Sequence, residues 1–492
     1  MDSKFEKINE IIDKNAARLD ESGAVSVYLE GKPALRKFFG KADRESGEAV
    51  TENTRYLLSI DSWFFTGLCV LVLADMKKLS FPDKLSRFIP EYKYADEITL
   101  SLLLTEKSGI RDFLSGELLP KIAADPEYAA LSDEERRARD SELLLRRHSF
   151  DDVMKLIGEK ELEFKPNLRR DYSETNRIFL REVVERASGM SIRAFAEEHI
   201  FKKLGMSETR FGAEGAAPLY ALFRNKTYLR LGADSQNPCL FTSTVSDLER
   251  LMLGIFEHRL FSKKIWKAAT KFDSEGEGLV FVDSNGTTLT AAEAGIQSLS
   301  LSFDEGARLC YLTVTNADSK YDLEGEEYIY FRRELRYAME GEFTYPKNTK
   351  MVPYGPKNWR GASDLKVRPE QLEFVCSANH TIVVAAAFKK EEHLFVEMEG
   401  NRAVGLLALR VNKKEDVYHI AIVLIDQRYQ HRGFGKVMLR FAVDYLKKAG
   451  AKKLSIGVNR YNIPAQKLYK SVGFHEDSIY DEFIYMTQDL TD

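Results

Sequence analysis

The run Gln430-His431-Arg432-Gly433-Phe434-Gly435-Lys436 decides how the C-terminal part of the chain folds. It follows an apolar strand pattern, Ile420 to Ile425, and it precedes an amphipathic helical pattern from Val437 to Tyr445. A glycine turn between a strand and a helix start presents backbone N–H groups that have no partner within the helix. Because a helix N-terminus is also electropositive, the run predicts a binding site for a pyrophosphate group.

Length and composition set the outer bounds. The chain has 492 residues, which is too long for one hydrophobic core and predicts two or three domains. Hydrophobic residues make up 44% and charged residues 30%, as in globular proteins. The 72 basic and 76 acidic side chains leave a net charge of −4, so no strongly basic field indicates nucleic acid as the main partner.

Targeting and redox signals are weak. The start, Met1 to Glu6, is charged and lacks the apolar core of a signal peptide, and the longest apolar stretch, Trp63 to Ala74, is too short to span a bilayer. The four cysteines are far apart and form no CxxC pair: Cys69, Cys239, Cys310 and Cys376. We therefore expect a cytoplasmic protein with no disulfide framework, metal site or membrane contact.

A second motif supports the glycine run. The stretch Asn459 to Phe474 places an Asn near a helix start and ends in Leu468-Tyr469 and Gly473-Phe474. Together with Gln-x-x-Gly-x-Gly, this motif resembles the GNAT acetyltransferases, and two motifs in order are more specific than one glycine loop. The resemblance implies a domain with a central mixed sheet flanked by helices, and acetyl-CoA as the cosubstrate.

The resemblance also implies residue roles. Val423 and Ile425 would offer backbone groups to the pantetheine arm, and the N–H groups from His431 to Lys436 would hold the pyrophosphate. Asn462 would contact the cofactor near the thioester, and Tyr469 would protonate the departing thiolate unless it is only a core tyrosine. The cofactor-binding residues expected in this way are Val423, Leu424, Ile425, Gln430, His431, Arg432, Gly433, Phe434, Gly435, Lys436 and Asn462.

The amine acceptor and the general base stay open. The segments Asn358-Trp359-Arg360, Leu365 to Gln371 and Leu424 to Gln430 resemble the bacterial polyamine acetyltransferases, but Ile422 stands where that group usually has Arg. An alkylammonium with a pKa of about 10.4 must lose a proton before attack. Candidate bases are Glu397, Glu399, His419 and Glu482, and each has a structural alternative as a strand or loop charge.

The resemblance to the GNAT family also implies the order of the C-terminal elements. Helices are predicted over Asn358 to Arg360 and Glu370 to Val375. The predicted strands are Leu394 to Met398, Val404 to Leu409, Ile420 to Ile425, Leu454 to Val458 and Phe483 to Met486, with a helix around Tyr469.

The N-terminal part reads as helices between early and late strands. Strands are predicted at Ala24 to Leu29, Leu279 to Val282 and Leu309 to Val314, with helices such as Leu180 to Ala187 and Ser246 to His258. Five phrases resemble the serine beta-lactamase and penicillin-binding-protein family in order: Lys78 to Leu85, Leu102 to Ile110, Asp171 to Asn176, His199 to Met206 and Leu240 to Leu248. The resemblance implies an antiparallel sheet with a helical subdomain.

The catalytic motifs of that family are missing. Aligning Phe65-Thr66 with the family's pattern puts Ile60 at the nucleophilic serine and Trp63 at the lysine. Glu174 replaces the Asn that should follow Tyr172, and the stretch Thr288 to Gly295 holds no Lys or His for the third motif. Ser59 and Ser62 lie close to the expected serine, but neither has a lysine three residues later. Tyr172 would be a relic, a core tyrosine or a ligand contact.

The sequence thus predicts two domains, a beta-lactamase-like domain over 1–338 and a GNAT domain over 352–492, joined by a linker over 339–351. We expect an acetyl-CoA-dependent N-acetyltransferase acting on a primary amine, with a polyamine or diamine as one candidate. Its N-terminal domain would bind a small ligand or a partner without turnover. The alternatives are an active serine hydrolase that uses Ser59 or Ser62, and a sensor that holds ligands without chemistry. The oligomeric state is open.

Overall fold

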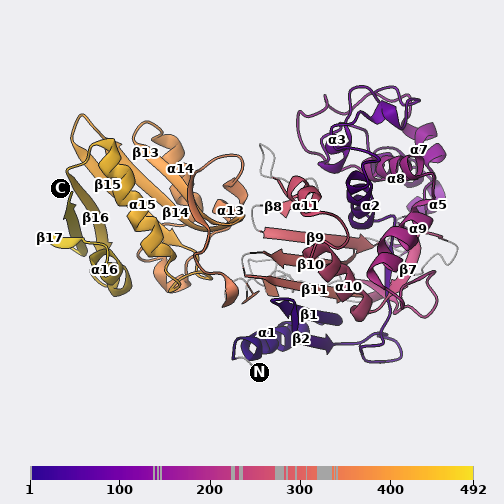
Figure 1. Cartoon of the computed structure of the whole chain (residues 1–492), viewed down its shortest axis with the longest axis horizontal. Helices are drawn as coiled ribbons and strands as arrows, with labels where there is room; N and C mark the ends of the chain where they lie inside the picture. Colours follow the sequence, from indigo (N-terminus) through magenta and orange to yellow (C-terminus); the bar gives the residue numbers. More distant parts are fainter. Residues whose placement is uncertain are drawn as a thin grey trace. The chain divides into compact units, whose positions relative to one another are not determined.

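The computed structural model describes residues 3–490 except 134, 137–138, 141–142, 144–146, 223–227, 232–236, 272–281, 284–285, 294–295, 306, 318–334, 337 and 340–341. The chain divides into two compact units (Figure 1). The first unit is built mainly from Met1–Lys271 and Thr287–Leu335, and the second mainly from Arg336–Asp492.

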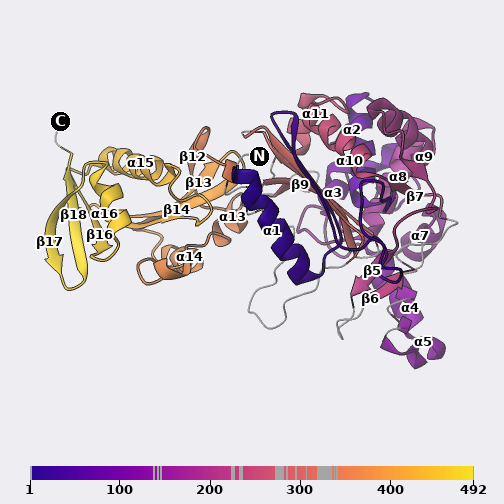
Figure 2. The same ribbon diagram turned by 90° about the horizontal axis from the view of Figure 1, so that it is seen from below.

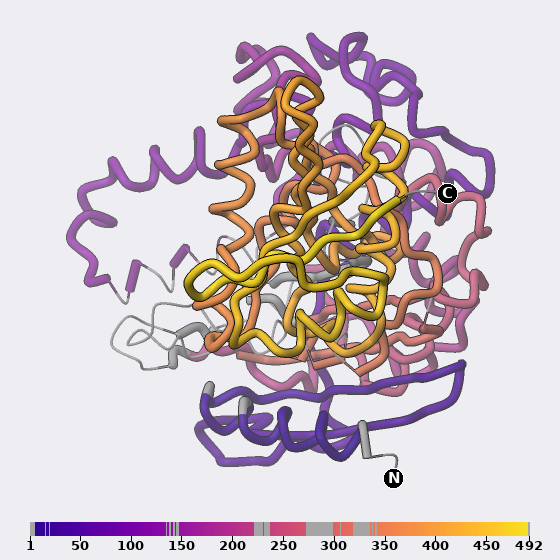
Figure 3. Tube along the Cα trace, turned by 90° about the vertical axis from the view of Figure 1, so that its left-hand side faces the viewer, coloured from indigo at the N-terminus to yellow at the C-terminus, as the bar shows by residue number. Residues whose placement is uncertain are grey.

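A sheet of six strands forms the base of the first unit (Figure 1), and its five strands from β2 to β9 run antiparallel to their neighbours. Its order is β2 (Lys32–Phe39), β1 (Gly23–Leu29), β11 (Leu309–Thr315), β10 (Ile296–Asp304), β9 (Gly286–Glu293) and β8 (Val282–Asp283). The predicted strands at Ala24 and Leu309 are confirmed. Of the strand predicted from Leu279 to Val282, residues 279–281 lie outside the described residues. The helix α1 (Ser3–Leu19) packs along β2 (Figure 3).

The helical part of the first unit is organised around α2 (Trp63–Asp75). Its residues from Phe64 to Ala74 are all buried, which is the pattern of a helix that is apolar on every side and lies inside a core. It packs against α8 (Glu174–Ser188). The other helices are α3 (Leu100–Leu104), α4 (Leu119–Ala123), α5 (Pro126–Ala130), α7 (Phe150–Ile157), α9 (Ile192–Ala196), α10 (Val245–Phe256) and α11 (Lys263–Ala269). Short strands complete the unit: β3 (Tyr56–Ser59), β4 (Arg210–Phe211), β5 (Leu219–Leu222), β6 (Tyr228–Leu231) and β7 (Leu240–Ser243).

A mixed sheet of seven strands forms the second unit. Its order is β12 (Thr349–Pro353), β13 (Glu392–Glu399), β14 (Arg402–Asn412), β15 (Val417–Ile425), β16 (Lys453–Asn459), β18 (Phe483–Asp489) and β17 (His475–Tyr480). The strands β15 and β16 run parallel, and the other neighbouring strands are antiparallel. The main segment of the second unit starts at Arg336, upstream of β12 and of the linker predicted over 339–351, which stays a prediction.

Helices cover both faces of this second sheet (Figure 2). The helix α15 (Phe434–Ala449) packs on one face against Leu407 and Leu409 of β14, while α13 (Trp359–Ser363) and α14 (Ala378–Ala387) pack on the other face against Leu406. The alternation of these leucines is what a strand buried on both faces requires. The helix α16 (Ile463–Lys470) packs beside α15.

Two predictions about elements in this unit need correction. The predicted helix from Glu370 to Val375 is only a 3-10 turn, η4 (Pro369–Gln371), because Pro369 starts a turn that no apolar periodicity continues. The second helix is α14, which begins after Ser377, whose hydroxyl caps it by accepting from the His380 N–H. The edge strands β12 and β17 were not predicted; β17 is exposed at every position and so carries no alternating pattern. The predicted fold class, two α/β domains with these two kinds of sheet, is confirmed.

Candidate functional site: a cleft where two parallel strands separate

The central feature of the second unit is the separation of β15 from β16. Their ladder joins only His419 to Ser455 and Ile420 to Ile456, although β15 continues to Ile425. Beyond Ile420, the backbone groups of β15 that face away from β14 therefore have no strand partner among the described residues. An unpaired strand edge of this kind is able to bind an extended chain through backbone hydrogen bonds.

A bulge in β15 marks the start of the separation. Ala408 of β14 is opposite Ile422, and Leu409 is opposite Ile420, so Ala421 is an extra residue on the β15 side of the ladder. An extra residue on one strand bends that strand and increases its local twist. The bulge thus supplies a physical reason for β15 to turn away from β16 at this point.

The glycine run forms the turn between β15 and α15. Gly433 has φ +99° and is the N-cap of α15, a backbone conformation that side-chain-bearing residues rarely adopt. Lys436 N–H donates to Gly433 O at 3.1 Å. The first two helical N–H groups, those of Phe434 and Gly435, have no backbone acceptor among the described residues. The Lys436 N–H is thus engaged within the turn, whereas the Phe434 and Gly435 N–H groups can donate to an anion.

A cleft of about 630 Å³ opens between these elements. Of the predicted cofactor-binding residues and the predicted acid, those that line it are Val423, Leu424, Ile425, Gln430, His431, Gly433, Gly435, Lys436, Asn462 and Tyr469. Arg432 and Phe434 do not line the cleft. The Arg432 guanidinium stacks on Tyr345, 5.0 Å from the ring centroid, and Phe434 is buried beside Tyr429.

Tyr469 lies in the wall of the cleft at the end of α16. Its side chain is 7% exposed and packs on Phe474, with ring centroids 6.4 Å apart. Burial raises the pKa of its phenol to about 12, because the charged phenolate loses its hydration there. The phenol is therefore protonated at neutral pH, which is the state that a proton donor needs.

Two amide side chains, those of Asn462 and Gln430, form hydrogen bonds to the elements that line the cleft. The Asn462 Oδ1 accepts from the Ala465 N–H at 3.2 Å and so caps α16, which leaves its amide nitrogen as the group available to a ligand. The Gln430 Nε2 donates to Ile425 O at 3.0 Å and to Gln371 Oε1 at 2.8 Å. Gln430 thereby links the end of β15 to η4.

A buried carboxylate makes the second link between these segments. Asp426 Oδ2 accepts from the Lys366 N–H at 2.8 Å, and Asp426 Oδ1 accepts from the Arg428 N–H at 2.9 Å and its Nε at 2.6 Å. Gln427 N–H donates to Lys366 O at 2.7 Å. These bonds hold the chain that leads into η4 against the end of β15, so the segment from Val367 to Val375 forms a fixed wall of the cleft.

None of the four candidate bases lines the cleft. Glu399 accepts from Lys347 N–H, Asn348 N–H and Thr349 Oγ1, and Glu482 is exposed in the turn between β17 and β18. The His419 Nδ1 lies 2.9 Å from Ser455 Oγ, and burial lowers the pKa of the imidazole.

Glu397 is fully buried, and neither of its carboxyl oxygens has a hydrogen-bond partner among the described residues. Burial, with a smaller contribution from the charge of Glu399, raises the pKa of Glu397 to about 9.

The first unit has no activated serine at the position where the resemblance places one. Ile60 is fully buried between β3 and α2, and Trp63 is the first residue of α2. Ser59 Oγ accepts from the Asp61 N–H at 3.1 Å, and Ser62 Oγ accepts from the Phe65 N–H as the cap of α2. Both hydroxyls thus stabilise the turn into the helix.

An ion-pair network occupies the same region. Asp61 is buried and pairs with Arg177 at 3.1 Å and with the buried Arg181, while Arg177 also pairs with Glu174 at 2.5 Å. Tyr172 donates to Glu174, although its side chain is 59% exposed. Glu174, which replaces the expected Asn, is therefore held by Arg177 beside Asp61. The stretch Thr288 to Gly295 falls on β9 and, at positions 294–295, outside the described residues.

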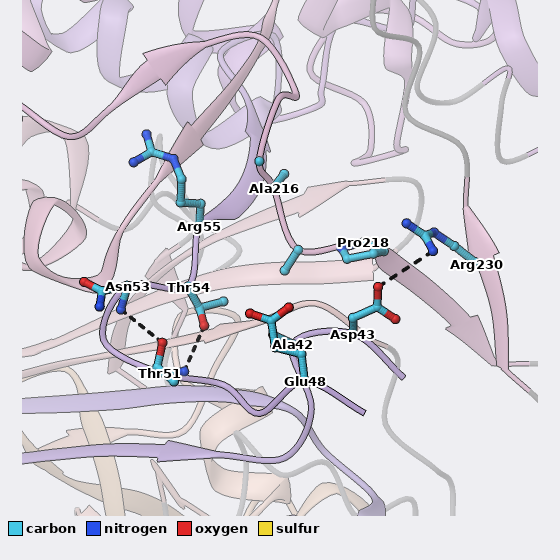
Figure 4. Close-up of a pocket in the computed structure, with 12 residues that line it drawn as sticks. Ala42, Asp43, Glu48, Thr51, Asn53, Thr54, Arg55, Ala216, Pro218 and Arg230 are labelled. Atoms are coloured by element: carbon cyan, nitrogen blue, oxygen red, sulfur yellow. Dashed lines mark hydrogen bonds and ion pairs between the residues drawn. The ribbon is translucent and has the colours of Figure 1, made fainter. Parts of the chain in front are cut away.

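A second cavity, of about 330 Å³, lies in the first unit between Asp43 and the segment 215–218 (Figure 4). Its two arginines are engaged within the unit. Arg230 pairs with Asp43 at 3.8 Å, and Arg55 Nε donates to Thr242 Oγ1 at 3.2 Å. These contacts give no indication of a ligand.

Within the described part of the chain, no group of three or more His, Cys, Asp or Glu side chains could hold a metal ion. The described helices also include none that is long and apolar enough to cross a membrane.

Two family models match the chain in separate regions. The model described as Beta-lactamase matches residues 10–290, more than half of the chain, and the model described as Acetyltransferase (GNAT) family matches residues 358–474. The chain belongs to the beta-lactamase family and carries a GNAT acetyltransferase domain. Both predicted resemblances are confirmed at the level of the family, and the GNAT domain implies acetyl-CoA as cosubstrate.

Curated relatives and solved structures are similar to part of the chain. A teichoic acid D-alanine hydrolase of Staphylococcus aureus is 25% identical over 276 residues, which cover 54% of this chain and 60% of the relative. The chain thus spans less than two thirds of the length of the curated relatives that it matches. A penicillin-binding protein from Bacillus halodurans has a TM-score of 0.52 at 19% identity, covering 68% of this chain and all of that one. A penicillin-binding protein homologue from Pyrococcus abyssi has a TM-score of 0.53 at 16% identity, and the match covers 84% of this chain and 89% of that one. These structures share the fold.

The cleft of the GNAT domain also contains residues that the sequence did not indicate. They come from the segment around η4, from β16 and from β18: Val367, Arg368, Glu370, Gln371, Phe374, Val375, Gly457, Val458, Asn459 and Phe483. Their recruitment depends on long-range contacts such as Asp426 to Lys366. Some of these residues, Val367 to Gln371 and Asn459, stand in segments that carry a family resemblance, but the sequence did not assign them to a cleft.

Proposed function

We propose that the chain is an acetyl-CoA-dependent N-acetyltransferase that acts on a primary amine. The observation that carries the proposal is the cleft where β15 leaves β16. It has an unpaired strand edge along one side, two free helix N–H groups at one end and Tyr469 in its wall, within the described part of the chain. A neutral phenol in the wall of the cleft suits a reaction that begins with a thioester and releases a thiolate.

In this proposal the cofactor takes the β15 side of the cleft. The pantetheine arm would pair with the backbone of Val423 and Ile425, as an added strand does. The N–H groups of Phe434 and Gly435 would hold the pyrophosphate, and Lys436 would add a charge-assisted contact. The amide nitrogen of Asn462, which helix capping leaves available, would reach the cofactor near its thioester end.

The proposed acetyl transfer needs few protein groups to account for its proton transfers. A neutral amine attacks the thioester carbonyl, the C–S bond breaks, and the departing thiolate takes the proton of Tyr469. The amine loses its proton to water, because none of the predicted bases lines the cleft. The phenolate of Tyr469 is then reprotonated from solvent. A polyamine or diamine is one candidate acceptor, on the resemblance of the opening segment and of Leu424 to Gln430.

We propose that the beta-lactamase domain binds a ligand or a partner and does not hydrolyse. By the alignment with the family's pattern, Ile60 and Trp63 stand where the nucleophile and the lysine would be, and Arg177 pairs with both Glu174 and Asp61. The curated relatives are named for hydrolysis of D-alanine from teichoic acid, so a D-alanyl ester is the class of ligand to test there. Because acetyl-CoA is made inside cells, we place the acetyltransferase activity in the cytoplasm.

The test is a turnover assay with the full chain, acetyl-CoA and a panel of primary amines. The readouts are free thiol and the mass of the acetylated product. The proposal expects thiol release above the amine-free rate together with an N-acetylated amine. Tight binding of acetyl-CoA without acetylation of any amine in the panel would instead support a sensor. A covalent penicillin adduct on Ser59 or Ser62 would support the hydrolase.

A further inference from the structure

In the proposed binding mode, the cofactor leaves one part of the cleft free for the amine. This part is formed by the segment from Val367 to Val375, by Ile422 after the bulge, and by Phe483 at the start of β18. The bonds from Asp426 to Lys366 and from Gln430 to Gln371 hold the first of these elements in place. An amine that approaches a thioester lying along β15 therefore meets a preformed wall.

The charge of this wall does not suit a polycation. Glu370 is the one carboxylate among the described residues that line the cleft, and the same segment contributes the cation Arg368. A polyamine carries two or more ammonium groups. Each ammonium loses hydration when it enters the cleft, and this loss costs free energy unless a carboxylate compensates for it. The single carboxylate of Glu370 can compensate for one ammonium group, so the cleft suits an amine with one positive charge.

The remaining surface is apolar and partly aromatic. Phe374, Val375 and Ile422 line the cleft, and Phe483 lines it while remaining 47% exposed. Gly457 adds no side chain, and the aromatic ring of Tyr485 lies 3.8 Å from where its Cβ would be. The exposed ring of Phe483 and the half-buried ring of Phe374, in a cleft that contains few charges, favour a ligand with an apolar body.

We propose that the acceptor is a primary monoamine with an aromatic or branched alkyl body. Glu370 meets its ammonium before deprotonation, and Phe374 and Phe483 cover its carbon skeleton. This inference rests on the proposed acetyltransferase function and narrows its substrate class away from the polyamines.

The test compares 2-phenylethylamine with spermidine as acceptors for the full chain at saturating acetyl-CoA. The expected result is a kcat/KM for 2-phenylethylamine higher by about tenfold or more, as burial of a phenyl ring predicts. A preference for spermidine would overturn the inference and leave the acetyltransferase function standing. Acetylation of neither these amines nor any other in a broad panel would overturn both.

Variants within the segment from Val367 to Val375 distinguish a loss of amine recognition from a general loss of activity. Phe374→Asp should lower kcat/KM for 2-phenylethylamine by about tenfold and reduce its advantage over spermidine. Leu372→Asp is the matched control, because Leu372 is 57% exposed in the same segment and does not line the cleft. Glu370→Gln should raise KM for the amine without changing KM for acetyl-CoA, and Glu373→Gln should change neither. Equal effects of Phe374→Asp and Leu372→Asp would contradict the assignment, provided that both variants bind acetyl-CoA normally.

Discussion

Glu397 is a carboxyl group whose burial should make the stability of the GNAT domain depend on pH. It lies on β13 between Met351 of β12 and Gly405 of β14, and it is 0% exposed. Neither carboxyl oxygen has a described hydrogen-bond partner, so the ionised form has no compensation for its lost hydration. The pKa of Glu397 is consequently raised from 4.5 to about 9.

The sign and the size of the effect follow from proton linkage. Between pH 4.5 and about 9 the folded domain keeps the proton of Glu397 and the unfolded chain does not. The free energy of unfolding therefore falls as pH rises through this window, by about 1.4 kcal/mol per pH unit for this group. Stability from this group is complete below pH 4.5 and is lost by about pH 9. Between pH 6 and pH 8 the loss amounts to about 3 kcal/mol.

The assay compares wild type with Glu397→Gln by denaturant unfolding at pH 6 and at pH 8. The transition that belongs to the GNAT domain is the one that acetyl-CoA shifts to higher denaturant. The stability of the variant relative to wild type should improve by about 3 kcal/mol from pH 6 to pH 8. Glu415→Gln, in the exposed turn between β14 and β15, should give no such change. A relative stability of Glu397→Gln that is the same at both pH values would refute the reasoning from burial.

Three further predictions test other parts of the molecule. Tyr469→Phe should lower kcat by about 10- to 10⁴-fold and leave KM for acetyl-CoA near normal; an unchanged kcat would assign Tyr469 to the core. Asp426→Ala should cost the GNAT domain about 3–5 kcal/mol in the free energy of unfolding, since it leaves the Lys366 N–H and Arg428 without their buried acceptor, and a loss below about 1 kcal/mol would mean that this link is dispensable. The wild-type chain should hydrolyse a chromogenic cephalosporin no faster than buffer does, and a rate above background that disappears in Ser59→Ala or Ser62→Ala would show that the beta-lactamase domain is active.

The elements that the sequence predicted well are those whose signal is local. The strand, glycine turn and helix from Ile420 to Tyr445 combine period-two and period-3.6 patterns with a glycine at positive φ, and the structure has β15, Gly433 and α15 at these positions. The helix around Tyr469 likewise begins at its Asn462 cap. Each of these depends on residues within one or two turns of each other.

The features that the sequence did not predict depend on distant residues or on the lack of a pattern. Nothing local marks Glu370 or Phe374 as part of the cleft, because their position depends on Asp426, which follows them by more than fifty residues. The candidate base Glu397 lies in a strand whose sequence pattern does not indicate that both of its faces are covered. Its complete burial is therefore known only from the structure of the surrounding sheet. The edge strand β17 is polar and exposed throughout, and a hydrophobic period could not reveal it.

Calorimetric titration of acetyl-CoA tests the central claim, that the cleft beside β15 holds this cofactor. Lys436 lines the cleft in the first turn of α15, whereas Lys448 is exposed in the last turn of the same helix. We expect wild type and Lys448→Glu to bind acetyl-CoA with the same affinity, and Lys436→Glu to bind at least about tenfold more weakly because the reversed charge faces the pyrophosphate. Equal affinity in all three proteins, with one site each, would place the cofactor elsewhere and contradict the claim.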